Sequence, residues 1–125
     1  MEIQPYWNED GSMYAALISS GYGSSWSADT EMPELAYDKR VVEWYLRHQD
    51  DTDYWGALYR RASPQIDEVM KMFREWGYKG YIWFGGLKPG MLRWVPKGQL
   101  WRIAEYDGAE HIEFFDKIGW ICYDD

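Results

Sequence analysis

The segment from Ser63 to Gly77 constrains the fold more than any other part of the sequence. Serine is favoured at the N-cap of a helix, proline at the first helical position, and glycine just beyond the end. Between these signals, Ile66, Met70 and Phe73 recur at the spacing of one helical face. The segment therefore predicts an amphipathic helix, which has to bury its apolar face against another layer of the domain.

After this helix the sequence changes to patterns that are typical of strands. The predicted strands, rich in aromatic or β-branched residues, cover residues 78–84, 91–95, 100–106 and 111–115, with 117–123 as a further short candidate. Asp107-Gly108 separates two of them and is a strong signal for a tight hairpin turn. Strands joined by such short connections predict an antiparallel meander.

The first half of the chain combines one strand with a second helix. Residues 1–12 hold several turn formers and predict an irregular lead-in, and Met13 to Ser19 predicts a short buried strand. A helix is expected to begin at Glu34, whereas residues 50–62 fit either an inserted turn or a short helix. We therefore expect a single α+β domain over residues 1–125, with a mostly antiparallel sheet of four or five strands and two main helices packed on one face.

The balance of charges limits the classes of partner. Acidic residues number 21 against 13 basic ones, which gives a net charge of −8. Direct nucleic-acid binding needs a basic surface and anionic membranes attract basic segments, so neither partner is expected. The charge permits a basic protein partner, mimicry of a nucleic acid, or a role in solubility alone. Cys122 is the single cysteine, which fits a reducing cytoplasm, and the first residues show no signal-peptide pattern.

The aromatic content points to a contact surface. Nine Trp and eleven Tyr are more large rings than a chain of 125 residues is expected to bury completely. Helices on one face of the sheet would leave rings on the other face exposed, which favours dimerisation or binding of another protein. The candidate residues for this partner surface are Tyr81, Trp83, Trp94, Trp101, Asp107 and Glu110.

A loop rich in glycine and serine follows the first predicted strand. Its candidate binding residues are Gly21, Tyr22, Gly23, Ser24, Ser25 and Trp26. Backbone N–H groups and hydroxyls in such a loop can bind a nucleotide or a sugar, and Trp26 can stack on a ring of the ligand. The loop lacks the lysine of a phosphate loop and does not match the dinucleotide fingerprint, which favours a structural turn in which Trp26 fills the core.

Catalytic and metal-binding patterns are weak. The imidazole bases are limited to His48 and His111, and the environment of each fits a surface or core-edge residue. Glu105, Glu110 and Glu113 flank the hairpin and could converge with Asp107 as carboxylates for a glycosidase, but solvent-facing strand residues fit better. No catalytic residue, metal ligand or cofactor is predicted, and the chain is expected not to be an enzyme, with a small hydrolase as an alternative.

Several short motifs occur together in a recognisable order. They are Ser20 to Ser27, Leu35 to Asp38, Val41 to Glu43, Pro96 to Gly98, and Ile103 to Glu110. In this order the chain resembles a family of small acidic proteins from bacteriophages and related mobile elements, with a departure around residues 50–62. The resemblance implies an accessory phage protein in the bacterial cytoplasm that binds and inhibits a host or defence protein. It implies no catalytic residues.

Overall fold

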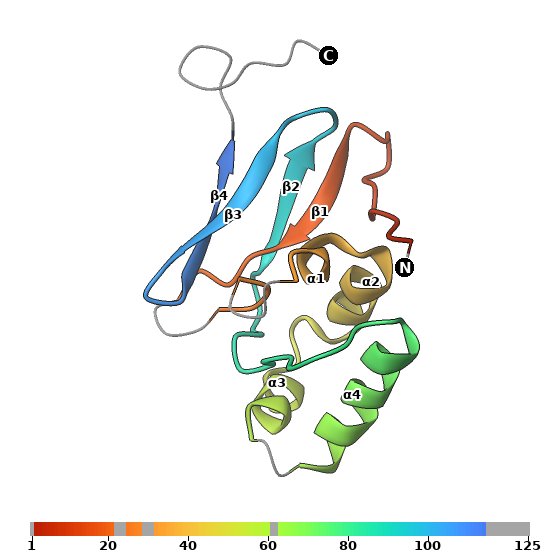
Figure 1. Ribbon diagram of the computed structural model, residues 1–125, viewed down its shortest axis with the longest axis vertical. Helices are drawn as coiled ribbons and strands as arrows, with labels where there is room; N and C mark the ends of the chain where they lie inside the picture. The colour runs from red at the N-terminus through yellow and green to blue at the C-terminus, as the bar shows by residue number, and fades with distance from the viewer. Residues whose placement is uncertain (1, 22–24, 29–31, 61–62, 115–125) are drawn as a thin grey trace.

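The computed structural model describes residues 2–21, 25–28, 32–60 and 63–114. Figure 1 shows the strands in its upper part and the last two helices at its lower end. The described elements are β1 (Met13–Leu17), α1 (Glu34–Tyr37), α2 (Lys39–His48), α3 (Thr52–Tyr59), α4 (Pro64–Glu75), β2 (Leu92–Pro96), β3 (Trp101–Tyr106) and β4 (Ala109–Phe114). The expected α+β class and single domain are confirmed.

The expected meander of four or five strands is wrong. Instead, β1 pairs with β2 and β3 pairs with β4, so the described strands form two separate two-stranded antiparallel sheets. The predicted strand at 78–84 is irregular in the structure. Its alternating apolar residues Ile82 and Phe84 are buried in the main core. Because one side of the segment is buried, the sequence alternates as in a strand, although the segment pairs with no described strand. The candidate strand at 117–123 lies outside the described residues.

β1 is covered on both faces. Ala15 and Leu17 belong to the main core with the helices, whereas Ala16 and Ile18 pack with Val95 in a second cluster. Apolar residues of the β3–β4 hairpin, namely Trp101, Ile103 and Ile112, pack against this second cluster. The two-faced burial explains why the strand is a continuous apolar run rather than an alternating one.

Local signals set the two ends of α4. Pro64 occupies the first turn, and Gly77 beyond the C-terminus has a φ of 101°, a left-handed conformation that favours glycine. Ser63 stands at the N-cap as predicted, but its hydroxyl donates to the carbonyl of Ala57 at 2.6 Å instead of capping α4. Ser63 therefore connects the start of α4 to α3. The helix α3 lies in the segment 50–62, for which the sequence fitted either an inserted turn or a short helix.

The helix that begins at Glu34 is divided at Asp38. This residue has an extended backbone, with ψ of 124°, and its carboxylate accepts the N–H of Arg40 at the start of α2. The same carboxylate is buried, forms an ion pair with the Arg40 guanidinium at 2.8 Å, and accepts the Tyr78 hydroxyl at 2.7 Å. A partner 40 residues away along the chain thus stabilises a break that the periodic pattern does not show.

Replacing Tyr78 with phenylalanine should change how stability depends on alkaline pH. Burial first, and then the bond to the Asp38 carboxylate, raise the pKa of Tyr78 above its ordinary value of 10.0. Because the folded-state pKa is raised, this stabilisation is complete below about pH 10 and is lost as pH rises further. Urea unfolding at several pH values measures the free energy of unfolding of both proteins. The excess of wild type over Tyr78→Phe should decrease by about 1.4 kcal/mol for each pH unit above pH 10. A pH-independent difference would contradict the assignment.

Candidate functional site

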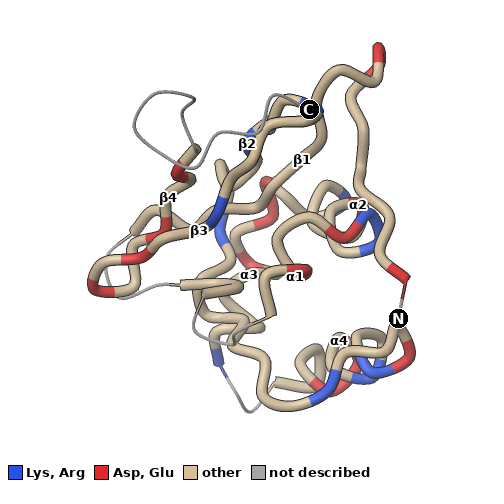
Figure 2. The backbone as a smooth tube through the Cα atoms, turned by 45° about the horizontal axis from the view of Figure 1, so that its top comes forward, with Lys and Arg blue, Asp and Glu red and all other residues tan. Residues whose placement is uncertain are grey.

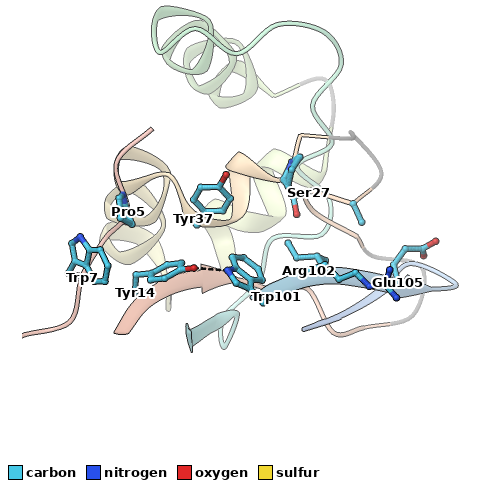
Figure 3. Close-up of a pocket in the computed structure, with 11 residues that line it drawn as sticks. Pro5, Trp7, Tyr14, Ser27, Tyr37, Trp101, Arg102 and Glu105 are labelled. Atoms are coloured by element: carbon cyan, nitrogen blue, oxygen red, sulfur yellow. Dashed lines mark hydrogen bonds between the residues drawn. The ribbon is translucent and has the colours of Figure 1, made fainter. Parts of the chain in front are cut away.

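A groove of about 870 Å³ is lined by residues of the N-terminal lead-in, α1, β1 and β3 (Figure 3). Its lining residues are Pro5, Trp7, Tyr14, Ser27, Ala28, Pro33, Tyr37, Trp101, Arg102, Ile103 and Glu105. In Figure 3, Trp7, Tyr14, Trp101, Arg102 and Glu105 form one row, and Pro5, Tyr37 and Ser27 face it across the groove. Segments that are far apart in the sequence therefore build a single elongated site.

Four aromatic rings dominate the groove. The ring centroids of Trp7 and Tyr14 lie 5.3 Å apart, those of Tyr14 and Trp101 6.2 Å apart, and those of Trp101 and Tyr37 6.0 Å apart. The neighbouring planes are inclined by 73°, 56° and 77°, so no two of these neighbouring rings stack face to face. The indole N–H of Trp101 donates to the Tyr14 hydroxyl at 2.6 Å, which fixes both rings from adjacent sheets.

Backbone contacts hold the lead-in in place as one wall of the groove. Trp7 and Tyr14 form an antiparallel bridge, and the N–H of Ala15 donates to the carbonyl of Tyr6 at 2.9 Å. On the other side, the N–H of Lys39 donates to the carbonyl of Gln4 at 2.7 Å. The lead-in, expected to be irregular, is thus anchored both to β1 and to the start of α2.

Glu110 does not line the groove but holds one of its lining residues, Ala28. It is 2% exposed, so its predicted role on a partner surface is wrong. Its carboxylate accepts the N–H of Ser19 at 2.9 Å and the N–H of Ala28 at 2.8 Å. A carboxylate that receives backbone donors in this way is retained in the interior because its lone pairs are satisfied. Glu110 therefore joins the backbone of Ser19 to that of Ala28, which lines the groove.

The charges at the groove are unevenly distributed. Figure 2 shows acidic positions gathered along the β3–β4 hairpin, with a basic position on β3. The Arg102 guanidinium forms an ion pair with Glu113 at 2.7 Å, whereas Glu105 uses one oxygen to accept the N–H of Gly108 at 2.7 Å. Burial, followed by the nearby charge of Glu34, raises the pKa of Tyr37.

The other predicted surface residues lie outside the groove. Tyr81 is 59% exposed and Trp94 is 38% exposed, while Trp83 is half-buried against Tyr59. Asp107 has a left-handed backbone at the hairpin turn, where it is exposed. Trp101 is the member of the predicted set that lines the groove.

Trp26 is a core residue and does not line the groove. It is fully buried, its indole N–H donates to the carbonyl of Leu35 at 3.1 Å, and its ring packs edge-on against Phe73. Ser25 beside it is buried as well. The structure therefore agrees with the prediction that Trp26 fills the core, and not with the prediction that its ring stacks on a ligand. Gly21 is half-buried outside the groove, and Tyr22, Gly23 and Ser24 lie outside the described residues.

Neither of the two histidines lines the groove. His48 stacks on Tyr54 with ring centroids 3.8 Å apart, burial lowers its pKa, and it does not line the groove. His111 is exposed with a 3.4 Å contact to Glu113, and Cys122 lies outside the described residues. Within residues 2–21, 25–28, 32–60 and 63–114, no group of three or more His, Cys, Asp or Glu side chains is arranged to hold a metal.

Sequence reasoning missed three of the four groove rings, namely Trp7, Tyr14 and Tyr37. Trp7 and Tyr14 stand on either side of a turn that contains Gly11, whose φ is 73°. Two aromatic residues that flank a cluster of turn formers are a signal for a short return of the chain, and this signal was available in the sequence.

Comparison of the chain with protein-family models, curated proteins and solved structures finds no match. None of the helices in the part of the chain that the structure describes has the length and apolarity to span a bilayer.

Proposed function

We propose that this protein is a non-enzymatic binding protein that holds a segment of a partner protein in the aromatic groove. The observation that carries the proposal is the convergence of Trp7, Tyr14, Tyr37 and Trp101 from the lead-in, β1, α1 and β3 on one groove. Trp and Tyr are the residues that most often dominate the binding energy of protein interfaces.

The groove is pre-organised for binding. Trp101 and Tyr14 are joined by a hydrogen bond, and the lead-in is tied to β1 and α2 by backbone bonds. Rings that are already held in place lose little conformational freedom when a partner binds. Trp7, which is 42% exposed, offers the most accessible ring surface of the four.

The net charge and the sequence resemblance suggest a biological setting. A net charge of −8 favours a basic partner surface through electrostatic steering. Together with the resemblance of the sequence motifs to those of phage proteins, this supports a phage-encoded protein that inhibits a host or defence protein in the bacterial cytoplasm. A second copy of the chain is the alternative protein partner.

A small-ligand role is the second candidate, because the volume of the groove falls in the range of small-molecule sites. The polar groups of Ser27, Arg102 and Glu105 could orient a nucleotide or a sugar between the rings. A nucleotide and oligosaccharide panel, read by thermal shift, would raise Tm in wild type and not in Trp7→Ala if this candidate were correct.

The proposal predicts that Trp7→Ala weakens binding of a partner isolated from bacterial lysate by about 30-fold, the loss expected for an aromatic hot-spot contact of about 2 kcal/mol. The matched control is Trp94→Ala, since Trp94 is similarly exposed, at 38% against 42%, but lies outside the groove. Calorimetric titration with the purified partner gives the ratio of the dissociation constants of each variant and wild type. Equal affinity for wild type and Trp7→Ala, or a larger loss with Trp94→Ala, would refute a groove-based function.

A further inference from the structure

We infer that the groove recognises an extended, proline-containing segment in the polyproline II conformation, with a basic residue at the end of the groove that Glu105 lines. This inference rests on the proposed function, because it specifies the chemistry of the partner segment. It draws on three features of the groove: the spacing of its rings, the pairing of its strands and the sign of its charges.

The row of rings offers an extended surface to a polyproline II helix. The rings of Trp7, Tyr14 and Trp101 lie in one row, with centroid distances of 5.3 Å and 6.2 Å between neighbours, and form a continuous aromatic surface (Figure 3). In a polyproline II helix, residues i and i+3 lie on one face about 9 Å apart, which lets both contact rings at different positions along this row. Proline rings pack against aromatic faces, and a segment already in this conformation loses little entropy on binding.

The backbone pairing of β1 disfavours the addition of a partner strand there. β2 occupies one edge of β1, and the lead-in occupies the other through the Trp7–Tyr14 bridge and the bond from Ala15 to Tyr6. Recognition along this wall therefore depends on side chains, and an aromatic groove that reads side chains is typical of polyproline II recognition.

The charges at the two ends of the groove give the segment a direction. At the Trp7 end, the ammonium of Lys97 lies 5.9 Å from the centre of the indole ring and repels a second cation. At the opposite end, Glu105 contributes a carboxylate on the exposed side of β3, and the charge of Arg102 is offset by its ion pair with Glu113. A lysine or arginine of the partner is therefore favoured beside Glu105 and disfavoured beside Trp7.

The test uses fluorescently labelled peptides of about ten residues, read by anisotropy against the full chain. One peptide carries prolines at positions i and i+3 followed by an arginine, a second has these prolines replaced by alanine, and a third has the arginine replaced by glutamate. We expect the first to bind, the second to lose at least about tenfold, and the third to lose about threefold, as for an exposed ion pair. Glu105→Gln should abolish the difference between the first and third, whereas Glu43→Gln, at an exposed position on α2, should not.

Equal binding of the proline and alanine peptides, or binding that Trp7→Ala leaves unchanged, would overturn the inference. So would the absence of peptide binding, or binding of maltohexaose instead of the peptides. If the isolated protein partner still depends on Trp7 in these cases, the proposed function stands and only the polyproline II chemistry fails. If the partner does not depend on Trp7, the proposed function itself fails, whatever the peptides do.

Discussion

Gly86→Ala is expected to reduce the free energy of unfolding by about 3 kcal/mol or more, which is a large share of the stability of a small domain. A β-carbon on Gly86 would lie 2.0 Å from the carbonyl oxygen of Ser25 and 2.7 Å from its carbonyl carbon. Both atoms belong to the backbone, so no side-chain rotation relieves the contact. The φ of Gly86 is not in the left-handed region, so the expected loss comes from space alone.

The residues around Ser25 restrict movement of its backbone away from a β-carbon at position 86. Trp26 is fully buried next to it, and Glu110 fixes the N–H of Ala28 at 2.8 Å. From the other side, the Ser19 hydroxyl donates to the carbonyl of Gly86 at 2.8 Å. Because Ala28 lines the groove, the substitution should also weaken partner binding by shifting that wall.

Urea unfolding followed by circular dichroism measures the loss, and Gly56→Ala is the matched control. Gly56 lies inside α3, and a β-carbon there would meet no atom within 4 Å. Alanine at that position should stabilise the protein by about 0.5–1 kcal/mol through helix propensity. If Gly86→Ala lowered the free energy of unfolding by less than about 1 kcal/mol, the close approach of Gly86 to the Ser25 backbone would be contradicted.

Trp26→Ala should destabilise the protein by about 3–5 kcal/mol, the range for removing a large ring from a packed core. The substitution removes a fully buried side chain whose ring contacts Phe73 and Phe84, and it leaves the carbonyl of Leu35 without the indole donor. Thermal unfolding should therefore show a decrease in Tm of more than about 10 °C.

The comparison with Trp7→Ala separates a core role from a binding role. Trp7 is 42% exposed, so its removal should cost less than about 1 kcal/mol of stability while it weakens partner binding. Trp26→Phe should recover part of the stability that Trp26→Ala loses, because a ring again fills the space. Wild-type stability of Trp26→Ala together with a loss of ligand binding would contradict the core assignment.

The parts of the fold that sequence patterns predicted are those that local chemistry determines. Gly77 ends α4 because it adopts a conformation that other residues avoid, and Asp107-Gly108 forms the hairpin with φ values of 51° and 83°. The positive φ at both positions is what a tight two-residue hairpin requires. In each case the signal and the structure lie within a few residues of each other.

The parts that were mispredicted depend on contacts between distant residues. The break at Asp38 is stabilised by Tyr78, and the burial of Glu110 depends on donors from Ser19 and Ala28. The strand-like alternation at 78–84 arises because one side of the segment is buried. It does not indicate which other segment of the chain lies beside residues 78–84.

The candidate site was predictable only in part. The excess of aromatic residues predicts rings that are not fully buried, and Trp101, one of the predicted surface residues, lines the groove. The groove itself forms because the lead-in returns along β1 and is also tied to α2, which brings Trp7 and Tyr37 to the same site. A sequence pattern within one element cannot show this convergence.

The most direct measurement of the groove's role is an indole N–H spectrum of ¹⁵N-labelled protein, recorded before and after addition of the isolated partner. Trp→Phe variants assign the signals of Trp7, Trp101, Trp94 and Trp26. Binding in the groove predicts changes at Trp7 and Trp101, which line it, and none at buried Trp26 or at Trp94 outside it. Changes confined to Trp94, with Trp7 and Trp101 unaffected, would contradict the account.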